Sequence, residues 1–259
     1  MGALHAGHRS LLALARRKVG PDGLVVTSIF VNPLQFGPQE DLSRYPRPLT
    51  DDLKQCRAAG VDLVFHPSAP AMYPVAPSVV VDENELTRGL CGAARPGHFR
   101  GVCTVVTKLF HLVRPDFAVF GQKDYQQLAI IRRMVRELNF PIAIVSGPTH
   151  RERDGLALSS RNAYLTPEQR REAPALRQTM LAGAEMMRAG ERNPVRLEKK
   201  LRKFFGASAP NGRIDYLTVV DADQLRPLRR LGGRGVLMGA AFFGATRLID
   251  NELVRIPKS

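Results

Sequence analysis

The sequence predicts an α/β protein with a Rossmann-like parallel sheet, flanked by helices, and a smaller α+β domain that follows it along the chain. Short apolar runs rich in β-branched residues alternate with helical stripes through residues 1–149. This alternation is typical of βαβ units, whose parallel strands are joined by right-handed helical crossovers. After residue 150, long charged helices precede three strands that have no long helix between them. That change of pattern indicates a second domain.

The expected strands of the first domain are the apolar runs 24–31, 61–65, 78–82, 116–120 and 141–145. Run 24–31 is mostly apolar, as in a parallel strand that is buried on both faces. Helices are expected after His8, near 50–59, and along 102–113 and 128–138, where apolar residues recur every three or four positions. We expect the glycine-containing stretch 83–101 to form a loop.

The domain boundary is expected at 149/150, which gives a domain of residues 1–149 and a smaller one of residues 150–259. The smaller domain is expected to hold helices at 167–189 and 194–205, the first of them kinked at Pro174. Its strands are expected at 214–220, 236–243 and 246–249. They predict a short and largely antiparallel sheet, because no crossover helices separate them.

The composition is that of an ordinary globular protein, with 44% apolar and 24% charged residues among 259. No apolar stretch of about 18 residues predicts a membrane span, and the first residues do not form a signal peptide. We therefore expect a cytoplasmic protein with no membrane partner. Cys56, Cys91 and Cys103 lack metal-type spacing, so three reduced thiols are expected rather than a disulfide framework or a structural zinc site.

The charge balance is basic, with 38 Lys and Arg against 24 Asp and Glu, a formal net charge of +14. Two explanations compete: a nucleic-acid binder held by phosphate contacts, and an enzyme whose small-molecule substrates are anions. The basic residues are spread along the chain, Trp is absent, and no stripe of aromatic and basic residues is suited to stacking bases. The enzyme is therefore favoured, and nucleic acid is an unlikely partner.

Polar clusters directly follow three of the predicted strands: Asn32–Gln35 after 24–31, Gly121–Asp124 after 116–120, and residues 146–151 after 141–145. Open parallel sheets bind ligands beyond the carboxyl ends of their strands. The clusters are therefore expected to converge on one crevice. There Gln35, Gln127 and Asn32 would orient a small polar substrate by hydrogen bonds.

The segment His5–His8 precedes a predicted helix, where free N–H groups and the helix dipole attract phosphate. Taken singly, this segment and each cluster are also consistent with a helix cap, a surface turn or a solvated loop. The sequence contains no Walker-type or GxGxxG phosphate loop, and no HExxH pattern that would indicate catalytic zinc.

Six segments together resemble one family: Met1–His8 (MGALHAGH), 28–37 (SIFVNPLQFG), 44–47 (RYPR), 95–99 (RPGHF), 120–127 (FGQKDYQQ) and 154–162 (DGLALSSRN). The set resembles the pantoate–β-alanine ligases, in register through residue 165 and more loosely to Asn251. HAGH looks like the HIGH signature of the nucleotidylyl-transferase superfamily, and LSSR stands where that superfamily has its KMSKS-type loop.

The resemblance implies an ATP-dependent condensation of (R)-pantoate with β-alanine. Pantoate would attack the α-phosphorus of ATP to give pantoyl adenylate and pyrophosphate. The β-alanine amine would then attack the adenylate to give pantothenate and AMP. The resemblance also implies Mg²⁺ with ATP, and a homodimer. It leaves the metal ligands unknown.

His8, His5, Lys123 and Arg161 are the catalytic residues that the resemblance implies. His8 is the better proton donor, because an imidazole with a pKa of about 6.5 can donate near neutral pH. Lys123 and Arg161 would neutralise charge on the leaving pyrophosphate, and Ser159 and Ser160 would donate to phosphate. The implied ATP-binding residues are Met1, Gly2, Ala3, Leu4, His5, Ala6, Gly7, His8, Gly121, Gln122, Lys123, Asp124, His150, Leu158, Ser159, Ser160 and Arg161. The implied pantoate-binding residues are Gln35, Gln127, Asn32 and Arg95, with Gln35 also near β-alanine.

The sequence departs from the family pattern at three places. Gln122 replaces a typical Glu, and His150 stands where an apolar residue is usual, so any ATP contact there would come from the backbone. The family also has a strand ending in Pro-Thr before the Met-Gly, which this sequence lacks. Because that strand is central to the family's sheet, we expect the sequence to be truncated at its start. The alternatives are an inactive relative, a nucleotidylyl transferase for another substrate, and a basic RNA-binding protein.

Overall fold

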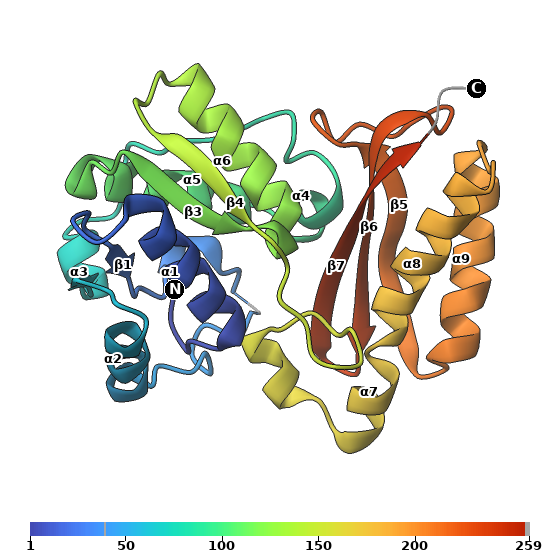
Figure 1. Cartoon of the computed structure of the whole chain (residues 1–259), viewed down its shortest axis with the longest axis horizontal. Coiled ribbons are helices and arrows are strands. Elements are labelled where there is room, and N and C mark those ends of the chain that lie inside the picture. Colours follow the sequence, from blue (N-terminus) through green and yellow to red (C-terminus); the bar gives the residue numbers. More distant parts are fainter. Residues whose placement is uncertain (39, 257–259) are drawn as a thin grey trace. The chain divides into compact units, whose positions relative to one another are not determined.

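The computed structural model describes residues 1–38 and 40–256, which divide into two units, Met1–Pro148 and Thr149–Ser259 (Figure 1). In chain order, the first unit consists of α1 (Ala6–Val19), β1 (Val26–Ser28), the 3-10 turn η1 (Pro33–Gln35), α2 (Leu49–Ala58), β2 (Leu63–Phe65), α3 (Ala69–Met72), α4 (Leu90–Ala94), α5 (His98–Val113), β3 (Phe117–Gly121), the 3-10 turn η2 (Gln122–Asp124), α6 (Tyr125–Glu137) and β4 (Ala143–Gly147).

The strands of the first unit are parallel, as the sequence predicts, but they form two pairs. β1 pairs with β2, with Val26 opposite Leu63, and β3 pairs with β4, with Phe117 opposite Ala143. Within the described ranges, no ladder of hydrogen bonds joins one pair to the other. The α/β architecture is therefore confirmed, while the expected single sheet is present as two two-stranded sheets.

Helix α1 packs against both sheets. Leu4, two residues before the helix begins, and Leu12 in its middle form a buried cluster with Ile29 and Cys56 beside β1 and α2. On another face of the helix, the Leu11 side chain lies over Gly147 at the end of β4. A Cβ atom added to Gly147 would fall 2.1 Å from Leu11 Cδ2. Glycine at the end of this strand therefore lets the helix approach the sheet closely.

Three expectations for the first unit are wrong. Residues 78–82 form no strand: Val79 is 83% exposed, and the Val81 N–H bonds the Thr104 hydroxyl at 3.1 Å instead of a neighbouring strand. Their β-branched residues favour extended backbone, but none of the strands in residues 1–38 and 40–256 pairs with them. The expected loop 83–101 contains α4 and the first turn of α5. Helix α1 begins at Ala6, before His8, because His5 caps it.

Helix α5 lies against the turn η1 through Gly101. A Cβ atom on Gly101 would fall 2.3 Å from the carbonyl oxygen of Leu34 and 2.7 Å from the backbone nitrogen of Gln35. The Gly101 carbonyl in turn accepts a hydrogen bond of 3.0 Å from the Asn32 side chain. Any side chain at position 101 would therefore displace the turn that carries Gln35.

The second unit contains the 3-10 turn η3 (Ser160–Tyr164), α7 (Pro167–Glu172), α8 (Ala175–Arg188), α9 (Pro194–Ser208), β5 (Gly212–Asp221), β6 (Gly233–Phe243) and β7 (Thr246–Ile256). β5, β6 and β7 form the predicted antiparallel sheet in that order, with strands longer than expected. The single helix expected over 167–189, with a kink at Pro174, is instead two helices, α7 and α8, that are separated at this proline. Helices α8 and α9 cover one face of the sheet (Figure 1), and Met180, Leu201 and Phe205 are buried in the core between them.

Cys56, Cys91 and Cys103 are buried, free cysteines. No helix in the described part of the chain is long and apolar enough to cross a membrane.

Gly101→Ala is expected to lower the free energy of unfolding by about 1–3 kcal/mol, since the new methyl group must displace backbone. Gly206→Ala in α9 is the matched control, because nothing lies within 4 Å of a Cβ atom there. That change should raise the free energy of unfolding by about 0.5–1 kcal/mol through helix propensity. Urea denaturation followed by circular dichroism measures both. Equal effects of the two substitutions would contradict the packing of α5 on η1.

Candidate active site

Two histidines form the N-terminal cap of α1. His5 Nδ1 accepts the Gly7 N–H at 3.1 Å, His8 Nδ1 accepts the His5 N–H at 3.4 Å, and the two ring centroids are 4.0 Å apart. A side-chain acceptor at the cap satisfies N–H groups that the helix itself leaves unpaired. Because each Nδ1 accepts, each neutral ring carries its proton on Nε2, which makes Nε2 the donor.

The charge state of His8 differs from the sequence expectation of an imidazole that titrates near neutral pH. Burial lowers the pKa of His8 to about 3, and the positive charges of His5 and Lys123 add to this shift. His8 is therefore neutral at pH 7 and acts there as a hydrogen-bond donor. Leu11 of α1 lies beside Gly121, 3.6 Å from where a Cβ atom would stand, so α1 packs against the end of β3 from which the Lys123 turn begins.

Asp52 on α2 holds the segment that leads into α1. Its carboxyl group is buried and accepts the N–H groups of Ala3 at 2.9 Å and Leu4 at 2.6 Å. Ala3 has a φ of 48°, a left-handed conformation that is unfavourable for a residue with a side chain. Gln55, one turn along α2, donates to the Leu4 carbonyl at 3.1 Å. Asp52 therefore stabilises a strained turn directly before the two histidines.

Lys123 and Asp124 lie in η2, immediately after β3, as expected for polar residues at a carboxyl strand end. Their charged groups are 3.9 Å apart, and the Lys123 side chain is largely buried. Gln122 and Gly121 belong to the same turn. Asp124 supplies the only carboxylate in this turn, and the described residues contain no group of three acidic, His or Cys side chains able to hold a metal.

Asn32 supports Gln35 in the turn η1. Its side chain is buried, its Nδ2 donates to Gln35 Oε1 at 3.2 Å as well as to the Gly101 carbonyl, and its Oδ1 accepts from the Tyr73 hydroxyl at 2.8 Å. Both ends of the Asn32 amide are thus occupied by protein. From the sequence, Asn32 was expected to contact the substrate. In the structure its side chain instead bonds the Gln35 side chain and so orients it.

Arg95 and His98 hold the backbone of the same turn. Arg95 makes two bonds to the Glu40 carboxylate, of 2.7 and 2.6 Å, and its Nη1 lies 3.0 Å from His98 Nε2. His98 Nδ1 lies 2.8 Å from the Gln35 carbonyl oxygen. Burial and the Arg95 charge lower the pKa of His98 to about 4. Burial alone would raise the pKa of Glu40, but the hydrogen bonds and the charge of Arg95 keep that pKa below its usual value.

Gln127 occupies the first turn of α6, four residues after Lys123. It is half-buried, and its side-chain amide has no protein partner among residues 1–38 and 40–256. Gln127 thus has its hydrogen-bonding groups available to a ligand, whereas the neighbouring Gln126 is fully buried.

The remaining predicted residues belong to the second unit. Leu158 N–H bonds the His150 carbonyl at 3.0 Å, next to an antiparallel bridge between Arg151 and Ala157. Arg151 makes bonds of 2.7 and 2.9 Å to the buried Asp250, which anchors the loop to β7. Ser159 caps η3 by accepting the N–H of Arg161 at 3.3 Å. His150, Leu158, Ser159, Ser160 and Arg161 therefore form one loop, as their spacing suggests.

The model of the pantoate–β-alanine ligase family matches residues 1–253. The chain belongs to this family. A pantothenate synthetase of Moorella thermoacetica is 53% identical over 256 residues, which cover 99% of this chain and 89% of the relative. The crystal structure of pantothenate synthetase from Thermus thermophilus has a TM-score of 0.92 at 47% identity, and the alignment covers all of this chain and 91% of that one.

A pantoate–β-alanine ligase from Francisella tularensis, complexed with "Beta-gamma ATP" and β-alanine, has a TM-score of 0.76 at 33% identity. The alignment covers 98% of this chain and 87% of that one. These findings confirm the family that the six sequence segments resemble, together with the fold.

Sequence reasoning on this ligase missed Asp52, Glu40 and His98. The sequence does contain an indication that Asp52 is buried. It precedes Cys56 by four residues, which places both on the inward face of α2. An acidic residue on a buried helical face requires a partner. That partner, the backbone at residues 3 and 4, is 48 or 49 positions away and could not be identified from the pattern.

Asp52→Asn is expected to lower the free energy of unfolding by about 1.5–3 kcal/mol, the range for hydrogen bonds to charged groups. The asparagine keeps one acceptor, and its NH₂ group then faces a backbone N–H. Asp51→Asn is the matched control, since the Asp51 side chain is 68% exposed. Amide hydrogen exchange at Ala3 and Leu4 should accelerate in the first variant alone. Unchanged exchange there would contradict the anchoring role of Asp52.

The depressed histidine pKa values predict a loss of stability in acid. Each histidine has a folded-state pKa below the usual 6.5, about 3 for His8 and about 4 for His98. The unfolded chain therefore takes up protons first, and the free energy of unfolding falls as the pH falls below about 6.5. NMR titration of the imidazole C–H signals should show both rings neutral at pH 5. Protonation of either ring near pH 6.5 would contradict the burial described here.

Proposed function

We propose that this ligase joins (R)-pantoate to β-alanine through a pantoyl adenylate formed from ATP, with release of pyrophosphate and then AMP. Membership of the family over residues 1–253 supports the reaction class. The observation that carries the assignment to this site is the packing of α1, through Leu11, against Gly121, which begins the turn that holds Lys123 and leads into Gln127. Phosphate-binding groups and a substrate-orienting amide thus come from adjacent positions.

In the first step, a carboxylate oxygen of pantoate forms a bond to the α-phosphorus. The bond from that phosphorus to the bridging oxygen breaks, and pyrophosphate leaves with the electron pair. A carboxylic acid with an ordinary pKa of about 4 is ionised at pH 7, so the nucleophile needs no base. The step needs the carboxylate to be aligned with the α-phosphorus. It also needs positively charged or hydrogen-bond-donating groups around the leaving pyrophosphate.

Lys123, His5 and His8 provide those donors within the first unit. The Nε2–H groups of the histidines and the Lys123 ammonium would bind the phosphate oxygens, beside the N–H groups of the first turn of α1. Bound triphosphate would raise the pKa of His8, because an opposite charge nearby favours the cationic form. His8 therefore serves as a neutral donor before ATP binds and becomes a better proton source once negative charge is present.

In the second unit, Arg161, Ser159 and Ser160 are proposed to contact the phosphates from their single loop. The nearby Asn162 Oδ1 is buried and has no hydrogen-bond partner in the described residues. A buried acceptor requires a donor, and among the groups of ATP the adenine amino group and the ribose hydroxyls can donate, whereas the ionised phosphates cannot.

In the second step, the β-alanine nitrogen bonds to the adenylate carbonyl carbon and loses a proton, and the carbonyl–oxygen bond to AMP breaks. Gln35 is proposed to hold both pantoate and the incoming amine. Its side chain is oriented by Asn32, and its carbonyl is held by His98. A rigid amide beside the reacting carbonyl reduces the entropy lost on reaching the transition state.

Mg²⁺ is proposed to accompany ATP. The ion usually keeps several waters and binds substrate phosphates plus one or two carboxylates. Asp124 fits that requirement as the carboxylate of η2 next to Lys123. Bound Mg²⁺ would neutralise phosphate charge. The homodimer and the cytoplasmic location stay predictions.

The alternative functions have less support. An RNA-binding role accounts for the net charge of +14 but not for the family match over residues 1–253. A nucleotidylyl transferase for another substrate would not need the Gln127 amide that follows the proposed phosphate-binding turn.

Exchange of labelled pyrophosphate into ATP tests the proposed first step. We expect exchange that requires pantoate and does not require β-alanine, because the adenylate forms before the amine reacts. Absence of exchange from folded protein with ATP and pantoate would contradict the proposal.

Substitution of Lys123 or His8 by Ala is expected to lower the exchange rate by at least about a hundredfold, the size of effect seen when one electrostatic donor is removed. Lys54→Ala is the matched control, since the Lys54 side chain is 74% exposed and lies elsewhere on α2. Its rate should stay within about twofold of the unsubstituted enzyme. Unchanged exchange in either site variant would refute the role assigned to that residue.

A further inference from the structure

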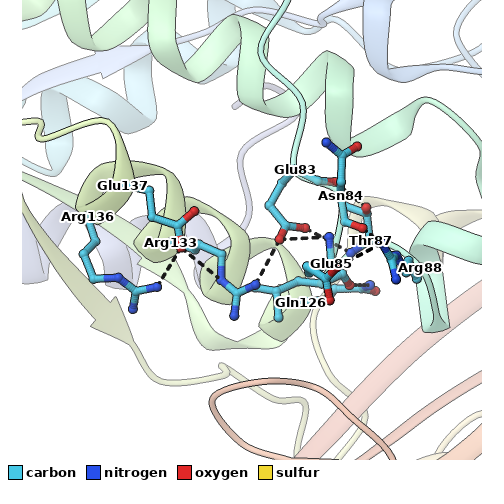
Figure 2. A network of polar contacts seen from close by, with 10 residues as sticks. Glu83, Asn84, Glu85, Thr87, Arg88, Gln126, Arg133, Arg136 and Glu137 are labelled. Atoms are coloured by element: carbon cyan, nitrogen blue, oxygen red, sulfur yellow. Dashed lines mark hydrogen bonds and ion pairs between the residues drawn. The ribbon is translucent and has the colours of Figure 1, made fainter.

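Gln126 uses its whole side-chain amide to hold one distant turn. It is 2% exposed, its Nε2 donates to the carbonyls of Leu86 at 2.7 Å and Gly89 at 2.9 Å, and its Oε1 accepts the Cys91 N–H at 2.9 Å. Figure 2 shows this side chain directed from α6 toward the turn. All three partners are backbone groups, so the contact fixes the path of the chain between residues 86 and 91.

The turn held by Gln126 is strained. Leu90 has a φ of 57°, a left-handed conformation that a leucine rarely adopts, and it lies between the two bonded residues Gly89 and Cys91. Gly92 packs so closely on Thr87 that a Cβ atom would fall 2.0 Å from the Thr87 carbonyl oxygen. Strained backbone persists where its surroundings force it, and such places are frequently functional.

An ion pair fastens the same segment to α6 at a second point. Arg133 Nη1 lies 3.2 Å from Glu83 Oε1, and both side chains are about nine-tenths buried (Figure 2). Glu83 also accepts the N–H groups of Glu85 at 3.2 Å and Thr87 at 3.1 Å. The segment is therefore tied to α6 at both of its ends, by Glu83 and by Gln126.

The turn held by Gln126 leads along the chain to Arg95 and His98, the residues that hold the backbone of Gln35. Helix α4 begins at Leu90 and ends at its cap Arg95, which bonds Glu40 and lies next to His98. His98 in turn contacts the Gln35 carbonyl. At the other end of this chain of contacts, Gln126 is the immediate neighbour of Gln127. One buried amide thus connects the backbone positions of both glutamines.

We propose that Gln126 is a positioning residue that fixes the separation of the Gln35 and Gln127 amides and thereby sets the selectivity for pantoate. This inference rests on the proposed function. Pantoate carries two hydroxyl groups, and two amides at a fixed separation can each bind one of them. A site built to bind a hydroxyl rejects the analogue without it, because its own polar groups are left unpaired. If the separation of the two amides is no longer fixed, the site loses its preference for pantoate over an analogue that lacks one hydroxyl.

Gln126→Met tests the inference, because methionine has a similar length but lacks the three hydrogen bonds. In the pyrophosphate exchange assay we expect the KM for pantoate to rise about tenfold and the KM for ATP to stay within about twofold. The preference for pantoate over its 4-deoxy analogue, 2-hydroxy-3,3-dimethylbutanoate, should fall at least about fivefold. Gln178→Met, at an exposed position on α8, is the control and should change none of these values.

A purely structural role of Gln126 would lower the melting temperature and leave the KM and the preference of the folded enzyme unchanged. That result would overturn the inference, as would equal rises in the KM for ATP and pantoate. If Gln126→Met does not fold, Gln126→Glu keeps the volume and faces two carbonyls with a carboxylate. Its KM for pantoate should approach the wild-type value at lower pH, where a protonated acid can donate again. A pH-independent KM ratio between Gln126→Glu and wild type would overturn the inference.

Failure of the proposed function is distinguishable from failure of the inference. Unsubstituted enzyme without pantoate-dependent exchange would remove both. Normal exchange in that enzyme, with unchanged selectivity in Gln126→Met, would remove only the role of Gln126.

Discussion

The packing of α1 against two separate sheets is the constraint on which the rest of the first unit depends. Leu12 fixes the helix to β1 and α2, while Leu11 lies over Gly147 at the end of β4. Both contacts bury apolar surface, and the second is possible only because position 147 has no side chain. They determine where the N-terminus of α1 lies. The position of the histidine cap relative to the turn that holds Lys123 follows from that placement.

Groups that react with no substrate hold the candidate active site in place. Asp52 binds the backbone before the histidines, Asn32 orients Gln35, and Gln126 holds the turn that leads to Arg95. Each of these side chains is buried and bonds groups that are distant in sequence, which for Asn32 are Gly101 and Tyr73. Buried hydrogen bonds of this kind are costly to break, because the group left behind is unsatisfied. Adenylate chemistry requires aligned reactants more than a strong nucleophile, so a rigid frame suits it.

The sequence predicted the α/β fold, the C-terminal antiparallel sheet, a distortion of the helix at Pro174 and the family. These features depend on local periodicity and short motifs. The strand at 78–82 was predicted wrongly, because β-branched residues favour extended backbone whether or not a partner strand exists. Asp52 and Gln126 were not predicted, since their partners are backbone groups some 35 to 49 positions away. The pKa of His8 also depends on burial and on Lys123, which a local pattern does not reveal.

Turnover of pantoate labelled with ¹⁸O in its carboxylate, followed by mass spectrometry of the products, distinguishes an adenylate from an acyl phosphate. Because the carboxylate oxygen of pantoate itself bonds to the α-phosphorus of ATP in the proposed reaction, we expect one labelled oxygen per turnover in the phosphate of AMP and none in pyrophosphate. Label in inorganic phosphate, together with ADP, would show activation through an acyl phosphate and would rule out the adenylate.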